Sequence, residues 1–183
     1  MKVLNDNNLK LKKEKCKFGY FSISVLGHMI GKGSIHPDPS KLNNLWEYPI
    51  PATRKQLFSF IGSVNYLREY IPLYSEIIKP LNDLKKVKTD LEKCWKEEHQ
   101  QAFDQLKQSI KFDVKLHVPN WAEKFYIATD ASNYSIGAIL YQEIGKQKRI
   151  IRMESKGLNE TQQRYSIPKK ELLAVVYAFY QIL

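Results

Sequence analysis

The spacing of apolar residues changes at Pro119, and this change constrains the fold more than any other feature of the sequence. Between residues 53 and 110, apolar side chains recur every three or four positions, which predicts amphipathic helices. After Pro119 the pattern favours three strands, the first of them buried, and then an apolar helix that we expect to be buried on nearly every side. These elements span 124–130, 136–142, 150–154 and 169–183. The order of elements predicts an α+β fold.

The first long helix has a clear beginning. Thr53 can accept a hydrogen bond from the first turn, and Gln56 lies three residues later, which is the pattern of a capping box. We expect this helix to cover 54–70 and to bury four residues of one face: Leu57, Ile61, Val64 and Leu67. Three further segments follow: a helix over 73–86 interrupted at Pro80, a polar linker over 85–93 and an amphipathic helix over 95–110.

The region before residue 53 predicts a β-hairpin and little other regular structure. Residues 21–26 alternate between apolar and polar side chains, as a half-buried strand does. The glycines of 31–34 indicate a turn, and 35–38 is then the return strand. Residues 40–52 are predicted to be mostly loop.

The charge of the chain indicates a polyanionic partner. Twenty-nine basic residues against 19 acidic ones give a net charge of +10, which suits nucleic acid or an anionic membrane surface. No apolar run approaches the roughly 18 residues of a membrane span, and no secretory leader is visible. Cys16 and Cys94 are too few for a disulfide scaffold or a zinc site, so we expect buried or partly buried thiols in a reducing compartment, cytoplasmic or nuclear.

A series of short motifs follows along the chain. They are Leu26-Gly27-His28-Met29-Ile30, Pro37-Asp38-Pro39-Ser40-Lys41, Pro49-Ile50-Pro51-Ala52-Thr53, Phe60-Ile61-Gly62-Ser63-Val64-Asn65-Tyr66, Ala102-Phe103-Asp104-Gln105-Leu106-Lys107, Thr129-Asp130-Ala131-Ser132 and Lys170-Glu171-Leu172-Leu173-Ala174. In this order they resemble the Pol polyprotein of gypsy-type long-terminal-repeat retrotransposons, and the resemblance covers almost the whole chain.

The resemblance implies three regions. Residues 1–52 would be the end of a reverse transcriptase palm with a primer-grip-like hairpin, and 53–118 would be thumb and connection helices. Residues 119–183 would be a truncated ribonuclease H-like domain, with a partial mixed sheet and one long helix. The Tyr-x-Asp-Asp motif of the family's polymerase site has no counterpart here. The parent activities would be RNA-directed DNA synthesis and hydrolysis of the RNA in an RNA·DNA hybrid.

The resemblance also assigns Asp130 and Glu171 to a catalytic magnesium site. In the family, carboxylates hold two Mg²⁺ ions, of which one activates water and the other stabilises the leaving oxygen. The family's two further aspartates have no counterpart before Leu183, so we expect weak or absent Mg²⁺ binding and little nuclease activity from this chain alone. From spacing alone, the alternative is that Asp130 caps a turn and Glu171 favours a helix start.

The first long helix is, by the same resemblance, a nucleic-acid-binding surface. Gly62 would allow close approach to the duplex, and Tyr66 would pack on sugars. Arg54, Lys55 and Arg68 would contact phosphates, which position a duplex without reading its sequence. The alternative is a purely structural helix, with Gly62 at a helix crossing and Tyr66 in the core.

Two more segments are candidates for nucleic-acid binding. In the hairpin, Leu26, Gly27 and His28 would hold the primer end; the alternative is a plain hairpin in which His28 is a hydrogen-bonded structural residue. In the basic stretch over 146–170, which includes Lys169 and Lys170, the side chains would face the backbone of the hybrid or only solvent.

Three hypotheses about function remain open. The chain is an enzyme fragment that works only with the rest of a Pol polyprotein, a non-catalytic module that binds nucleic acid, or an inert remnant of a degraded element. The partner would be an RNA·DNA hybrid or a template–primer duplex, and no membrane partner is expected.

Overall fold

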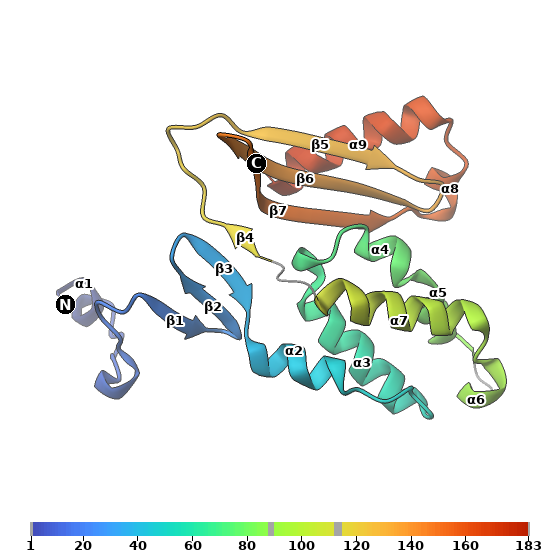
Figure 1. Ribbon diagram of the computed structural model, residues 1–183, viewed down its shortest axis with the longest axis horizontal. Helices are drawn as coiled ribbons and strands as arrows, with labels where there is room; N and C mark the ends of the chain where they lie inside the picture. Colours follow the sequence, from blue (N-terminus) through green and yellow to red (C-terminus); the bar gives the residue numbers. More distant parts are fainter. Residues whose placement is uncertain (1, 88–89, 112–114, 183) are drawn as a thin grey trace.

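The computed structural model describes residues 2–87, 90–111 and 115–182 (Figure 1). The described residues have the predicted α+β fold, with a four-stranded and a three-stranded sheet. Every described strand pairing is antiparallel, whereas a mixed sheet was predicted at the C-terminal end. Short turns join the consecutive strands, and such turns can connect only antiparallel neighbours.

The N-terminal sheet is a meander rather than a single hairpin. After α1 (Lys2–Asp6) and the 3₁₀ turn η1 (Lys13–Lys15), the strands are β1 (Ser22–Val25), β2 (His28–Gly31) and β3 (Ser34–Pro37), and β4 (Leu116–His117) later pairs with β3. The additional turn lies at Leu26-Gly27, where both residues have positive φ angles, 49° and 78°. Two such residues in succession are typical of a tight hairpin turn.

The prediction that residues 40–52 are mostly loop is wrong in its first half. Helix α2 (Pro39–Trp46) begins directly after Asp38, whose carboxylate accepts a hydrogen bond of 3.0 Å from the Ser40 amide. Pro39 occupies the first helical position, where the missing N–H costs nothing. Pro39, which directly follows the predicted return strand, thus begins a helix.

The helical region has the predicted order of elements. It contains α3 (Arg54–Tyr66), the 3₁₀ turn η2 (Arg68–Tyr70), α4 (Tyr74–Ile77), α5 (Lys79–Leu84), α6 (Leu91–Cys94) and α7 (Glu97–Lys111). Thr53 and Gln56 form the predicted capping box, and the four predicted core residues of the first long helix are all buried. The predicted break lies at Ile78, two residues before Pro80. The predicted linker over 85–93 includes α6, and its residues 88–89 lie outside the described part of the chain.

The helical region is organised around one hydrophobic core. Phe60 of α3 and Phe103 of α7 pack with ring centroids 4.6 Å apart. Met153 from the C-terminal sheet is buried in the same core. The core therefore joins the helices to the sheet that follows them.

The C-terminal sheet consists of β5 (Tyr126–Ala131), β6 (Ser135–Ile144) and β7 (Gln147–Gly157), followed by α8 (Glu160–Gln163) and α9 (Ile167–Ile182). Strand β5 is an edge strand within the described residues, so its side chains are exposed or half-buried, and the prediction of a buried strand is wrong.

The sheet lies between α9 and the helical region (Figure 1). Ile136 packs with Ala174 of α9 on one face, whereas Met153 packs with the helical core on the other. Ala174 of α9 is buried against the sheet, with Leu173 and Tyr177 partly buried beside it. Leu172 and Tyr180 on the outer side are 64% and 83% exposed, so the prediction of burial on nearly every side is wrong.

Candidate nucleic-acid interface

Helix α3 presents a face of small and polar side chains to solvent. Ser59, Gly62 and Ser63 are exposed on it, and a Cβ atom built on Gly62 would have no neighbour within 4 Å. Gly62 therefore does not lie where a second helix crosses α3, and the structural alternative for this glycine is wrong. Gly62 lines hollows on both sides of the helix, so this stretch of backbone is open to an approaching molecule.

The first hollow, of about 590 Å³, lies between α3, α2 and the turn at Leu26-Gly27. The Tyr66 hydroxyl donates a hydrogen bond to the Leu26 carbonyl. A Cβ atom on Gly27 would lie 2.5 Å from the Tyr66 hydroxyl oxygen, so only glycine allows this approach. Tyr66 is 40% exposed, which rules out the alternative of a core residue. The tyrosine fastens the hairpin to α3 and keeps part of its ring accessible.

His28 makes the contacts of a hydrogen-bonded structural residue, which was the alternative to a role in holding the primer end. Its Nδ1 lies 2.8 Å from the Tyr70 hydroxyl, and its ring stacks on Tyr66 with centroids 5.0 Å apart. Burial raises the pKa of Tyr70 to about 12, so this hydroxyl keeps its proton at neutral pH. Leu26, 88% exposed, lies at the tip of the turn. The structure thus brings the three hairpin candidates next to α3.

The predicted phosphate-contacting residues lie at the two ends of α3. Lys55 in the first turn and Arg68 beyond the last turn are exposed. Arg54 is half-buried, and its Nη2 atom has no hydrogen-bond partner within the part of the chain that the structure describes.

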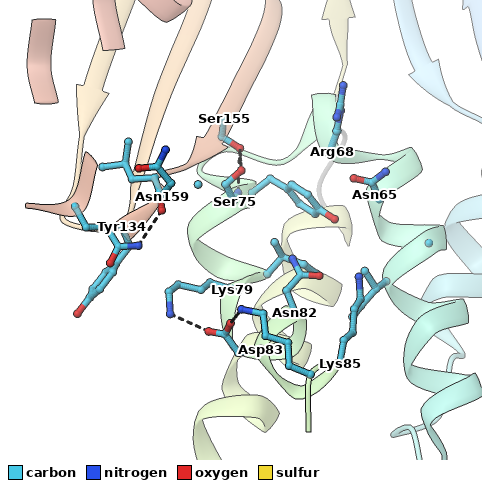
Figure 2. A pocket seen from close by; sticks show the side chains of 18 of the residues that line it. Asn65, Arg68, Ser75, Lys79, Asn82, Asp83, Lys85, Tyr134, Ser155 and Asn159 are labelled. Carbon is cyan, nitrogen blue, oxygen red and sulfur yellow. Dashed lines mark hydrogen bonds and ion pairs between the residues drawn. The ribbon is translucent and has the colours of Figure 1, made fainter. Parts of the chain in front are cut away.

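The second hollow separates the helical region from the C-terminal sheet (Figure 2). We call it the interdomain cleft. It has a volume of about 930 Å³, and its walls come from α3, η2, α4 and α5 on one side and from the β5–β6 turn, the end of β7 and α8 on the other. Sequence reasoning missed this cleft, because its two walls come from residues 58–86 and 134–163 and no local pattern connects them.

The two candidate catalytic carboxylates lie at the same end of the C-terminal sheet. Asp130 is the penultimate residue of β5 and is exposed; its Oδ1 accepts a hydrogen bond of 3.0 Å from the Ala131 amide. Glu171 is half-buried near the start of α9. The neighbouring Lys170 donates from Nζ to Asn133 Oδ1 at 3.0 Å, which ties the start of α9 to the β5–β6 turn.

The strand register places these carboxylates on different sides of the sheet. Ala131 pairs with Ile136 on the face that α9 covers, so alternation directs Asp130 to the face of the helical region. Glu171 belongs to α9, which covers the opposite face of the sheet. Within residues 2–87, 90–111 and 115–182, no group of three or more His, Cys, Asp or Glu side chains could hold a metal ion. Two carboxylates supply the hard oxygen ligands that Mg²⁺ prefers, but few of them.

The basic stretch over 146–170 is partly occupied by internal contacts. Lys170, predicted to bind nucleic acid, is only 5% exposed and is bonded to Asn133, so that prediction is wrong. Arg152 pairs with Glu154 at 2.7 Å. Lys169 is exposed, as a phosphate contact requires.

Comparison with known proteins places these features in a family context. Residues 95–182 match the model of the RNase H-like domain found in reverse transcriptase. The retrovirus-related Pol polyprotein from transposon 297 of Drosophila melanogaster is 38% identical over 175 residues, which cover 96% of this chain and 16% of that protein. The transposon Tf2-3 polyprotein of Schizosaccharomyces pombe is 30% identical over 177 residues, 96% of this chain and 13% of that protein. The chain thus spans a small part of the relatives that it matches.

Solved structures share the fold. The foamy viral protease-reverse transcriptase in complex with an RNA/DNA hybrid superposes with a TM-score of 0.77 at 22% identity, over 92% of this chain and 23% of that one. The same protein in complex with dsDNA gives a TM-score of 0.75 at 22% identity, over 88% of this chain and 34% of that one.

No helix within the described residues is long and apolar enough to cross a membrane. Transposon Pol polyproteins are homologues of this chain, and its residues 95–182 match the RNase H-like domain found in reverse transcriptase.

Proposed function

We propose that the chain is the nucleic-acid-binding thumb and RNase H-like segment of a gypsy-type Pol polyprotein, and that it holds an RNA·DNA hybrid or a template–primer duplex against α3. The open position of Gly62 carries this proposal, because its backbone is accessible in the middle of the exposed face of α3. The two foamy viral complexes, which contain a hybrid and a DNA duplex, support the choice of partner.

The chemistry of the α3 face suits a duplex. Ser59, Gly62 and Ser63 leave little bulk, so a groove edge can approach the helix closely. Tyr66 offers an exposed ring beside them, and Lys55 and Arg68 can meet phosphates at either end. The net charge of +10 adds a general attraction to a polyanion.

The carboxylates support a more limited proposal. Asp130 and Glu171 would be the Mg²⁺ ligands of this chain, at the same end of the C-terminal sheet. The strand register directs Asp130 away from α9, which carries Glu171, so the two carboxylates do not converge as a ready-made site. The chemistry supplied by bound Mg²⁺ is activation of a water and stabilisation of the leaving oxygen in RNA hydrolysis. Two carboxylates neutralise two divalent ions poorly, so we propose that this chain by itself binds Mg²⁺ weakly and acts mainly by binding nucleic acid.

Fluorescence anisotropy with a labelled RNA·DNA hybrid tests the proposed function. The logarithm of the association constant should fall linearly with the logarithm of the salt concentration, with a slope of about −0.9 for each phosphate contact. Phosphatidylserine vesicles serve as a polyanionic surface without a duplex. No binding of the hybrid, or equal binding of hybrid and vesicles, would contradict the proposal.

A further inference from the structure

The interdomain cleft has walls with an excess of positive charge. Four basic side chains line it against two acidic ones: Arg68, Lys79, Lys85 and Lys86 against Asp83 and Glu160. Asp83 accepts from both Lys79 and Lys86, at 2.9 Å each, so its charge is already matched (Figure 2). The hydrogen bond from Lys86 lowers the pKa of Asp83 below its ordinary value.

Two of the cationic side chains remain free for an anion. Neither Arg68 nor Lys85 has an ion-pair partner among the residues that the structure describes. Arg68 is exposed at the upper rim of the cleft in Figure 2, and Lys85 lies over the Phe58 ring at 5.6 Å on the side of α3. Neutral side chains that can donate hydrogen bonds also line the cleft: Asn65, Asn82 and Asn159.

The walls of the cleft are held at a fixed separation. The Ser75 amide donates to Ser155 Oγ at 2.9 Å, and Ser135 Oγ donates to Glu76 at 3.2 Å. A Cβ atom on Gly137 would lie 3.5 Å from Leu73, so the sheet and the α4 segment are in close contact there. These contacts preform the cleft, and a ligand would not have to order it.

The cleft also connects the two parts of the proposed site. Gly62 and Asn65 of α3 line one wall. Tyr134 lines the other wall, in the turn that directly follows Asp130, and Lys79 lies over its ring at 5.2 Å. A strand that leaves α3 toward Asp130 would pass along this cleft.

We propose that the interdomain cleft binds the phosphodiester backbone of one strand of the duplex, between α3 and the Asp130 end of the C-terminal sheet, with Arg68 and Lys85 as its phosphate contacts. The inference rests on the proposed function and adds a second binding surface to it. A free nucleotide carries the same phosphate chemistry, so the test has to separate the two ligands.

Salt titrations of hybrid binding to the full chain test the cleft. Arg68→Ala and Lys85→Ala should each reduce the magnitude of the salt slope by about 0.9, so that the loss of affinity between about 50 and 200 mM salt is about threefold smaller. Arg68→Lys should restore the slope, because it keeps the charge. Lys124→Ala removes an equally exposed charge at the opposite end of β5 and should leave the slope unchanged.

The outcomes separate this inference from the proposed function. Because Arg68 also belongs to the α3 interface, Lys85→Ala is the variant that separates the two surfaces. Hybrid binding with an unchanged slope in Lys85→Ala would overturn the cleft and leave the α3 interface standing. If Arg68→Ala weakens ATP binding and not hybrid binding, the cleft is a nucleotide site and the inference is wrong. A wild-type chain that does not bind the hybrid would overturn the proposed function, and the inference with it.

Discussion

Gly62→Ala should make the protein more stable and a weaker ligand of nucleic acid. Residue 62 lies in the interior of α3, and the added methyl group would have no neighbour within 4 Å. Alanine is favoured over glycine in a helix interior by about 0.8–1.0 kcal/mol. A change of that size raises Tm by about 2–4 °C in a chain of this length.

The same methyl group would stand between α3 and the duplex. Forcing one extra methylene into a well-packed contact costs about 1–3 kcal/mol, which corresponds to roughly 5- to 150-fold weaker binding. A structural role alone cannot produce opposite changes in Tm and affinity. A higher Tm together with weaker hybrid binding would therefore indicate that residue 62 is glycine because the ligand approaches the backbone there.

Calorimetry and hybrid anisotropy on the same samples measure both quantities. Gln108→Ala on the exposed side of α7 is the matched control, since it improves helix propensity away from α3 and should not change affinity. Higher Tm with wild-type affinity for the hybrid would refute the reasoning about the interface. Lower Tm would refute the open environment of residue 62.

Four further predictions follow from single contacts. Tyr66→Phe removes the hydrogen bond to Leu26, and urea titration should show about 0.5–1.5 kcal/mol less stability together with weaker hybrid binding. Thr53→Ala removes the cap of α3 and should cost about 1 kcal/mol by the same titration, with hybrid affinity unchanged. In a cleavage assay with Mg²⁺ the chain alone should hydrolyse hybrid RNA slowly or not at all; turnover that Asp130→Asn abolishes would contradict this. Burial lowers the pKa of His99 below its ordinary 6.5, so the unfolded chain takes up the proton first. The free energy of unfolding should therefore fall as pH drops below about 6.5. A constant free energy of unfolding over that range, or the same pH dependence in His99→Gln, would be the contrary result.

Local signals predicted the helical region well. The capping box at Thr53 and the break before Pro80 depend on neighbouring residues, which a sequence displays directly. The helix at α2 was missed because Pro39 is compatible with both a strand end and a first helical turn, and the side chain of Asp38 decides between them. Partly buried Cys16 and Cys94 confirm the expectation for the two thiols.

Contacts distant in sequence could not be predicted. The burial of Lys170 depends on Asn133 in another turn, and its charge alone favoured a surface role. Helix α9 is apolar on nearly every side, so its sequence does not indicate which side packs on the sheet. The exposure of Leu172 is known only from the three-dimensional packing. The interdomain cleft likewise arises from the contact of Ser75 with Ser155, 80 residues away.

The binding of a duplex to the face of α3 can be observed residue by residue by NMR. Amide chemical shifts of the isotopically labelled chain, recorded during titration with an unlabelled RNA·DNA hybrid, report which residues change their environment. The account predicts the largest changes at Ser59, Gly62, Ser63 and Tyr66. Saturable binding that leaves these four amides unchanged, with the changes confined to the outer side of α9, would contradict it.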